Sequence, residues 1–119
     1  MYQYRANVLR VVDGDTVEAV VDLGFDVRIT KSIRVIAESH PYFDTPETWR
    51  PKTEAERTHG EAAKKRAIEL LEGKNIILDS LKDGKYRYVA KIKLDNNVDY
   101  GDLMINEGYQ KRDDYPADN

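Results

Sequence analysis

Residues 7–36 read NVLRVVDGDTVEAVVDLGFDVRITKSIRVI, a stretch that is rich in β-branched residues and is broken by two turn dipeptides, Asp-Gly and Leu-Gly. These features predict three consecutive strands. The expected strands span 7–12, 16–23 and 25–36. In the third strand the apolar Ile33 and Val35 alternate with polar residues that include Arg34, and successive strand residues point to opposite faces. Arg34 is therefore expected to point away from the core.

The remaining sequence predicts a loop, two helices and two more strands. Prolines interrupt residues 38–57, which form the expected loop. A capping box, Thr58-x-x-Glu61, predicts a helix that ends at Gly73. The further elements are expected at 75–79 (strand), 86–94 (strand with a basic polar face), 99–107 (helix) and 111–119 (frayed tail). Together these elements predict one α+β domain over residues 1–119, built on a five-stranded barrel with two flanking helices, whose groove suits an extended polymer.

Composition limits the classes of function. The chain has 119 residues, and 19 Lys and Arg against 22 Asp and Glu give a net charge of −3. This balance argues against affinity for nucleic acid through net charge alone and leaves open a local basic patch. It has no cysteine, which rules out disulfides and thiolate metal sites. We find no apolar stretch long enough for a membrane span or a signal peptide. The expectation is a monomer without membrane contact, cytoplasmic or viral by default, or secreted if a signal has been trimmed.

Four carboxylates, Asp13, Asp15, Asp44 and Glu47, lie in turns or loops beside strand ends. Carboxylate and carbonyl oxygens are the ligands that hard divalent cations such as Ca²⁺ prefer. Each motif alone also has an ordinary structural explanation, because Asp-Gly is a common turn and Pro-Glu a common helix start. The carboxylates by themselves therefore leave both interpretations open.

The order of the motifs is more specific. From the N-terminus they read VDGDTV at 12–17, IRV at 33–35, DTPE at 44–47, HGEAA at 59–63 and KYRYVA at 85–90. This order resembles the staphylococcal nuclease (thermonuclease) family over roughly residues 8–108. The resemblance implies an OB-fold barrel and a calcium-dependent, sugar-nonspecific nuclease. Such an enzyme hydrolyses phosphodiester bonds of single-stranded or duplex DNA and of RNA and leaves 3′-phosphate ends.

The resemblance also implies a metal site. By motif, Asp15 and Asp44 match the direct calcium ligands, and the carbonyl of Thr45 completes the ligands that the protein supplies. Asp13 matches a supporting carboxylate outside the direct ligands. The metal site expected from the resemblance therefore depends on two loops that are far apart in the sequence.

The catalytic and substrate-binding roles are implied in the same way. Glu47 matches the residue that orients or deprotonates the attacking water, and Arg34 and Arg87 match the pair that binds the scissile phosphate. A guanidinium suits that task because its donors match phosphate oxygens and it stays charged. Lys85 and Tyr86 match residues that contact the neighbouring phosphate.

The chain departs from the family pattern in two places. Residues 38–42 are additional between Arg34 and Asp44, and the glycine that the family has before Arg87 is missing, which shifts the register of Lys85 and Tyr86. These departures leave two alternatives open: a catalytically impaired module of the same fold that binds nucleic acid or a protein partner, and a redesigned sequence with a disturbed site.

Three aromatic or imidazole residues near these motifs have open roles. The C-terminal tyrosines do not align cleanly, so Tyr109 and Tyr115 are only candidates for stacking on a nucleotide. For Trp49, covering the edge of the core is favoured over stacking on a base. His59 is expected to have a surface or capping role.

Overall fold

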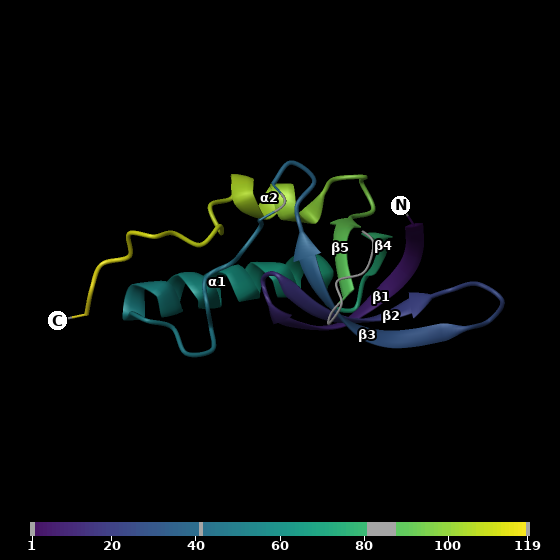
Figure 1. The fold of residues 1–119 in the computed structure, drawn as a ribbon, viewed down its shortest axis with the longest axis horizontal. Coiled ribbons are helices and arrows are strands. Elements are labelled where there is room, and N and C mark those ends of the chain that lie inside the picture. The colour runs from purple at the N-terminus through teal and green to yellow at the C-terminus, as the bar shows by residue number, and fades with distance from the viewer. Residues whose placement is uncertain (1, 41, 81–87, 119) are drawn as a thin grey trace.

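The computed structural model describes residues 2–40, 42–80 and 88–118, and it contains five strands and two helices in these ranges (Figure 1). In chain order the elements are β1 (Tyr2–Asp13), β2 (Thr16–Asp22), β3 (Arg28–Ile36), α1 (Glu54–Leu71), β4 (Asn75–Ser80), β5 (Tyr88–Lys93) and α2 (Tyr100–Asn106). No helix in the described ranges is long and apolar enough to cross a membrane.

The five strands form a closed barrel in the order β1-β2-β3-β5-β4. All neighbouring strands are antiparallel except β3 and β5, which pair in parallel with Ile33 opposite Tyr88 and Val35 opposite Ala90. The core consists mostly of β-branched side chains of the strands, together with apolar residues of α1 and α2. The predicted α+β fold with a five-stranded OB-fold barrel and two helices is confirmed.

The alternation along β3 also agrees with the prediction. Ile33 and Val35 are buried, whereas Arg34 is only partly buried and points out of the barrel interior. β1 begins earlier than expected, because residues 2–7 pair with β4 along their whole length. β3 begins later, at Arg28, because residues 23–27 form the turn between β2 and β3, with Phe25 and Asp26 in the left-handed region at φ 52° and 61°.

The start of α1 differs from the prediction, which was wrong by about one turn. The helix begins at Glu54, and its N-cap is Thr53, whose hydroxyl accepts a hydrogen bond from the Glu56 N–H at 3.1 Å. The Glu56 carboxylate in turn accepts a bond from the Lys52 N–H at 3.0 Å. Thr53 and Glu56 thus satisfy free amides at the helix start, and the predicted cap at Thr58 lies inside the helix.

α2 holds the connection between β3 and α1 against the barrel. Its N-cap is Asp99, which is the first residue of the predicted helix at 99–107. Its first helical residue, Tyr100, is completely buried. The ring of Tyr100 packs edge-on against Phe43, which is also completely buried, with ring centroids 6.2 Å apart. Residues on either side of Phe43 are thereby fixed beside the ends of β1 and β3.

Candidate functional site

Asp15 is the buried centre of the predicted site. It directly precedes β2, only 5% of its surface is exposed, and its carboxylate accepts bonds from three residues. The Arg34 Nη1 lies 2.5 Å from Asp15 Oδ2, the Thr45 N–H donates to the same oxygen at 3.0 Å, and the Thr16 hydroxyl donates to Oδ1 at 3.0 Å. Asp15 thus joins the turn after β1, the end of β3 and the loop before α1.

Arg34 bridges the two predicted metal-ligand carboxylates. Besides Asp15, its Nη2 donates to the Phe43 carbonyl at 2.8 Å and lies 3.5 Å from Asp44 Oδ1. The structure therefore brings Asp15, Arg34 and Asp44 together, as the resemblance implied. In this arrangement the guanidinium neutralises the carboxylates that a cation would otherwise neutralise.

The pKa values of Asp15 and Asp44 are shifted in opposite directions. Burial opposes the charge on Asp15, but the Arg34 guanidinium and the hydrogen bond from the Thr45 amide outweigh it and lower the pKa of Asp15. Burial, together with the neighbouring Asp15 carboxylate, raises the pKa of Asp44. Two carboxylates held this close repel each other when both are charged, and a cation between them removes that repulsion.

Thr45 is held in place by a glycine. Its side chain is buried against Gly14, where a methyl group would lie only 2.6 Å from Thr45 Cγ2. The Gly14 carbonyl accepts a hydrogen bond from the buried hydroxyl of Tyr100. The glycine of the Asp-Gly-Asp motif is therefore required for the close approach of the loop that carries Thr45. Among the described residues, no group pairs with the buried hydroxyl of Thr45.

Glu47 lies at the edge of this cluster. Its side chain is partly exposed, and burial raises its pKa, whereas the Lys111 ammonium, 4.0 Å from its Oε1, opposes that shift. The backbone at Glu47 passes directly over α1: a methyl group on Gly60 would lie 2.7 Å from the Glu47 carbonyl oxygen and 2.8 Å from that of Pro46. The position of Glu47 is thus set by a close contact with the helix.

Asp13 has a different hydrogen-bond partner from the other predicted site carboxylates. It accepts a hydrogen bond from the Thr48 hydroxyl, and burial raises its pKa although this bond opposes the shift. Asp13 therefore anchors the loop that follows Glu47. The other predicted site residues, Lys85, Tyr86 and Arg87, lie outside the described residues.

The first two additional residues, Glu38 and Ser39, are bound to α2 and β5. The Glu38 N–H donates to Asp99 at 3.0 Å, and the N–H of Ser39 donates to Asp102 at 3.0 Å. The Glu38 carboxylate pairs with Lys91 Nζ at 2.8 Å. The start of the additional segment is therefore anchored on α2 and β5, and the chain returns to place Asp44 beside Arg34.

Two residues at the site were not found by sequence reasoning. The Asp44 N–H donates to the Gln110 side chain at 3.1 Å, and its carbonyl accepts from the Lys111 N–H at 2.7 Å. Lys111 Nζ also lies 3.8 Å from the buried carboxylate of Glu56. The segment after α2 thus holds both backbone polar groups of Asp44. No local pattern indicates this, because the contacts depend on the fold.

His59 and the C-terminal tyrosines have structural partners. His59 Nδ1 is 2.6 Å from the Tyr115 hydroxyl, and Nε2 is 2.7 Å from the Gly108 carbonyl. The rings of His59 and Tyr109 also pack together, with centroids 6.2 Å apart. His59 therefore joins the C-terminal segment to α1.

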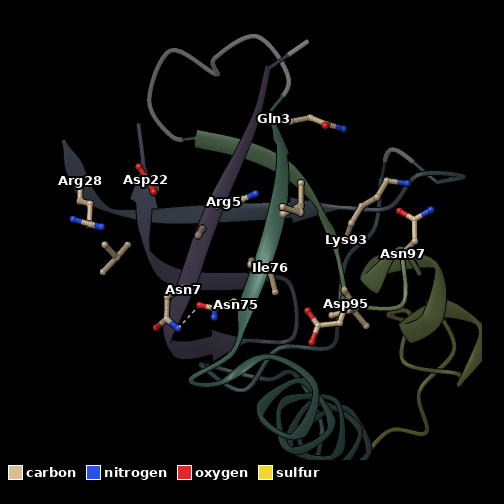
Figure 2. Close-up of a pocket in the computed structure, with 14 residues that line it drawn as sticks. Gln3, Arg5, Asn7, Asp22, Arg28, Asn75, Ile76, Lys93, Asp95 and Asn97 are labelled. Carbon is tan, nitrogen blue, oxygen red and sulfur yellow. Dashed lines mark hydrogen bonds between the residues drawn. The ribbon is translucent and has the colours of Figure 1, made fainter. Parts of the chain in front are cut away.

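A pocket of about 610 Å³ lies on the barrel away from the predicted site (Figure 2). Arg5, Arg28 and Lys93 line it together with Asp22 and Asp95, and none of the predicted site residues contributes. Its charges of both signs favour no particular ligand. In the part of the chain that the structure describes, no three His, Asp or Glu side chains are grouped closely enough to hold a metal by themselves.

One of the comparisons with known proteins supports the family resemblance over residues 42–118. A search of curated proteins found no match. The profile of the family described as Staphylococcal nuclease homologue matches residues 42–118, which include Asp44, Thr45 and Glu47. The match covers more than half of the chain, and the closed barrel with two helices agrees with it. The chain belongs to the staphylococcal nuclease homologue family.

Proposed function

We propose that this protein is a calcium-dependent nuclease that hydrolyses phosphodiester bonds of single-stranded or duplex DNA and of RNA and leaves 3′-phosphate ends. The observation that supports this most directly is the Asp15–Arg34–Asp44 cluster, in which two carboxylates and a guanidinium meet at one edge of the barrel. Family membership supports a nuclease in general terms.

The donor set fits a hard cation that keeps several waters. Asp15 and Asp44 would hold it, with the carbonyl of Thr45, and three grouped side chains are not required because water supplies the remaining ligands. Burial and the Asp15 carboxylate raise the pKa of Asp44, and a cation bound between the two would favour the charged form of both carboxylates. Calcium, when bound, supplies positive charge that stabilises the negative charge developing on the phosphate.

Activation of the attacking water and binding of the phosphate are assigned to side chains of the protein. Glu47 is partly exposed at the edge of the cluster, where its carboxylate can accept a proton from the attacking water. Arg34 holds its guanidinium next to the carboxylates, where it can donate to the phosphate oxygens, and Arg87 is proposed as its partner. The proposed catalytic residues are therefore Arg34, Glu47 and Arg87, with Lys85 and Tyr86 binding the neighbouring phosphate.

The test is cleavage of single-stranded and duplex DNA with millimolar calcium, with EDTA as the metal-free arm. We expect cleavage that EDTA abolishes. Asp44→Asn and Glu47→Gln should each lower the rate by about 10²–10³, because each removes one group that acts in the transition state. Asp95→Asn, at an exposed turn, is the matched control and should cleave like the parent.

Two outcomes would contradict the proposal. A folded protein that binds single-stranded DNA in a salt-dependent manner without cleaving it would be a binding module of the same fold. Equal cleavage by the parent, Asp44→Asn and Glu47→Gln would mean that the site has been assigned to the wrong residues.

A further inference from the structure

Trp49 is strongly exposed two residues after Glu47. The structure leaves 73% of its surface in solvent, which contradicts the expectation that it covers the edge of the core. A large apolar side chain gains little free energy of folding from such a position. The guanidinium of Arg50 lies over the indole, 5.5 Å from the ring centroid.

The backbone that carries Trp49 is anchored on both sides. Before it, the Thr48 hydroxyl is bonded to Asp13, and after it the Lys52 N–H is bonded to the Glu56 carboxylate at 3.0 Å. Arg50 itself is in the left-handed region with φ 54°, which turns the chain between these two anchors. The indole and the guanidinium are therefore presented together from a short, fixed loop.

The other aromatic candidates near the site are engaged elsewhere. Tyr115 bonds to His59 through its hydroxyl, and Tyr109 packs against the core and the His59 ring. Arg50, in contrast, pairs with no carboxylate in the part of the chain that the structure describes. Trp49 and Arg50 thus combine an exposed indole with a positive charge that no carboxylate of the described residues neutralises.

We propose that Trp49 and Arg50 form a stacking subsite for a nucleobase of single-stranded nucleic acid, beside the phosphodiester cluster. The inference rests on the proposed function for the identity of the polymer. Two extended residues span at most about 7 Å, so a base on Trp49 belongs to a nucleotide adjoining a phosphate at Glu47. Indole stacking is tolerant of base identity, and the Arg50 guanidinium supplies a partner for the phosphate.

This subsite favours single strands over duplexes. Bases in a duplex are already stacked on each other and are not free to stack on a protein side chain, whereas bases of a single strand are. A phosphate chain without bases can meet only the charged half of the pair. The subsite therefore distinguishes a single strand from an abasic strand of equal charge, and it also distinguishes a single strand from a duplex, whose bases are not free to stack on Trp49.

The chain has a single tryptophan, so its fluorescence reports on this position alone. We would titrate the protein in EDTA, where cleavage cannot interfere, with an oligothymidylate, an abasic strand of the same length and a duplex of the same length. The oligothymidylate should quench the emission, and the abasic strand and the duplex should quench it much less. Equal quenching by the abasic strand would overturn the proposal.

Variants separate stacking from general binding. Trp49→Ala should weaken binding of the labelled oligothymidylate, measured by anisotropy, by about 5- to 100-fold, the range carried by one base–aromatic stack. Trp49→Phe should recover part of the loss, and binding of the abasic strand should stay within about twofold of the parent. Phe25→Ala is the matched control, since Phe25 is fully exposed at the turn between β2 and β3.

These results are independent of catalysis. One outcome would separate the two proposals: the parent does not cleave, its emission is quenched by the oligothymidylate, and Trp49→Ala binds the oligothymidylate more weakly. This outcome would support the subsite and overturn the proposed nuclease function. Calcium-dependent cleavage by a protein whose oligothymidylate affinity is the same in the parent and Trp49→Ala would support the nuclease and overturn the subsite.

Discussion

Gly60 is the residue whose substitution should reveal how tightly α1 and the site loop are packed. It lies inside α1, where alanine alone would favour the helix by about 1 kcal/mol. A methyl group there would instead lie under 3 Å from two backbone carbonyl oxygens, those of Pro46 and Glu47. Backbone atoms cannot move away without shifting the loop, so we expect Gly60→Ala to lower the free energy of unfolding by about 1–3 kcal/mol.

Urea denaturation measures this change. Glu61→Ala, at the exposed neighbouring position of the same helix, is the control and should stay within about 0.5 kcal/mol of the parent. A Gly60→Ala protein more stable than the parent would show that helix propensity outweighs the contact, and that the loop is packed less closely than described.

At the residue scale, the sequence predicted the charged members of the site well. Asp15, Arg34 and Asp44 were identified from motifs, and the structure brings them together although they are up to 29 positions apart. Gln110 and Lys111 were missed, because they act on Asp44 through its backbone. Backbone hydrogen bonds between distant loops leave no pattern in the residue types, so this part of the site required the structure.

Among the elements, the segment that begins at Glu38 gives a prediction about ionisation. The hydrogen bond and the charge of Lys91 hold the pKa of Glu38 below its ordinary value of 4.5. A carboxyl whose pKa is lower in the folded state stabilises the fold above its unfolded pKa, and this contribution is lost as the pH falls through the folded value. We expect an NMR titration to give a Glu38 pKa below 4.5 in the parent.

Lys91→Met should return the Glu38 pKa to about its ordinary value, since it removes both the hydrogen bond and the charge. Lys31→Met, at a lysine that lies over the Tyr88 ring, is the control and should leave the Glu38 titration unchanged. If Glu38 titrated at or above 4.5 in the parent, the additional segment would not be anchored on β5 in solution.

The error at the start of α1 shows why element bounds are harder to predict than elements. Both Thr53-x-x-Glu56 and Thr58-x-x-Glu61 have the residue types of a capping box, five positions apart. The prediction used the second as the helix start, whereas the helix begins after the first. The structure resolves the choice, because the Thr53 hydroxyl accepts from the Glu56 N–H and the Glu56 carboxylate accepts from the Lys52 N–H.

For the whole molecule, the segment after α2 connects the site to the rest of the fold. Gln110 and Lys111 hold Asp44, and Tyr115 is bonded to His59 on α1. Deletion of residues 110–119 should leave the barrel folded by circular dichroism but lower calcium-dependent cleavage by at least about tenfold, because small displacements of catalytic groups are costly. The Asp44 amide should also exchange its hydrogen faster with solvent.

Deletion of residues 112–119 is the matched control. Both truncations lose the Tyr115 contact, but this one retains Gln110 and Lys111, so the difference between them reports on the support of Asp44. We expect it to keep most of the cleavage and the slow exchange of Asp44. Equal behaviour of the two truncated proteins would show that Gln110 and Lys111 do not position the site. Whether residues 111–119 are frayed stays a prediction.

The barrel as a whole was predictable because strand number and alternation are local properties of the sequence. The parallel pairing of β3 with β5 was not, since it joins segments more than fifty residues apart through backbone hydrogen bonds. The pairing places Ile33 and Val35 opposite Tyr88 and Ala90. It closes the barrel and fixes the end of β3, and with it Arg34, beside the loop that carries Asp44.

The close contacts at Gly14 and Gly60 have a consequence for the evolution of this sequence. Each glycine leaves room for one part of the same loop, Gly14 for the side chain of Thr45 and Gly60 for the backbone of Pro46 and Glu47. The loop therefore packs directly against the backbone at two glycines from separate parts of the fold. Replacing either glycine alone brings a methyl group within 3 Å of this loop. We therefore expect the two glycines and residues 45–47 to evolve together, although 46 positions separate the glycines.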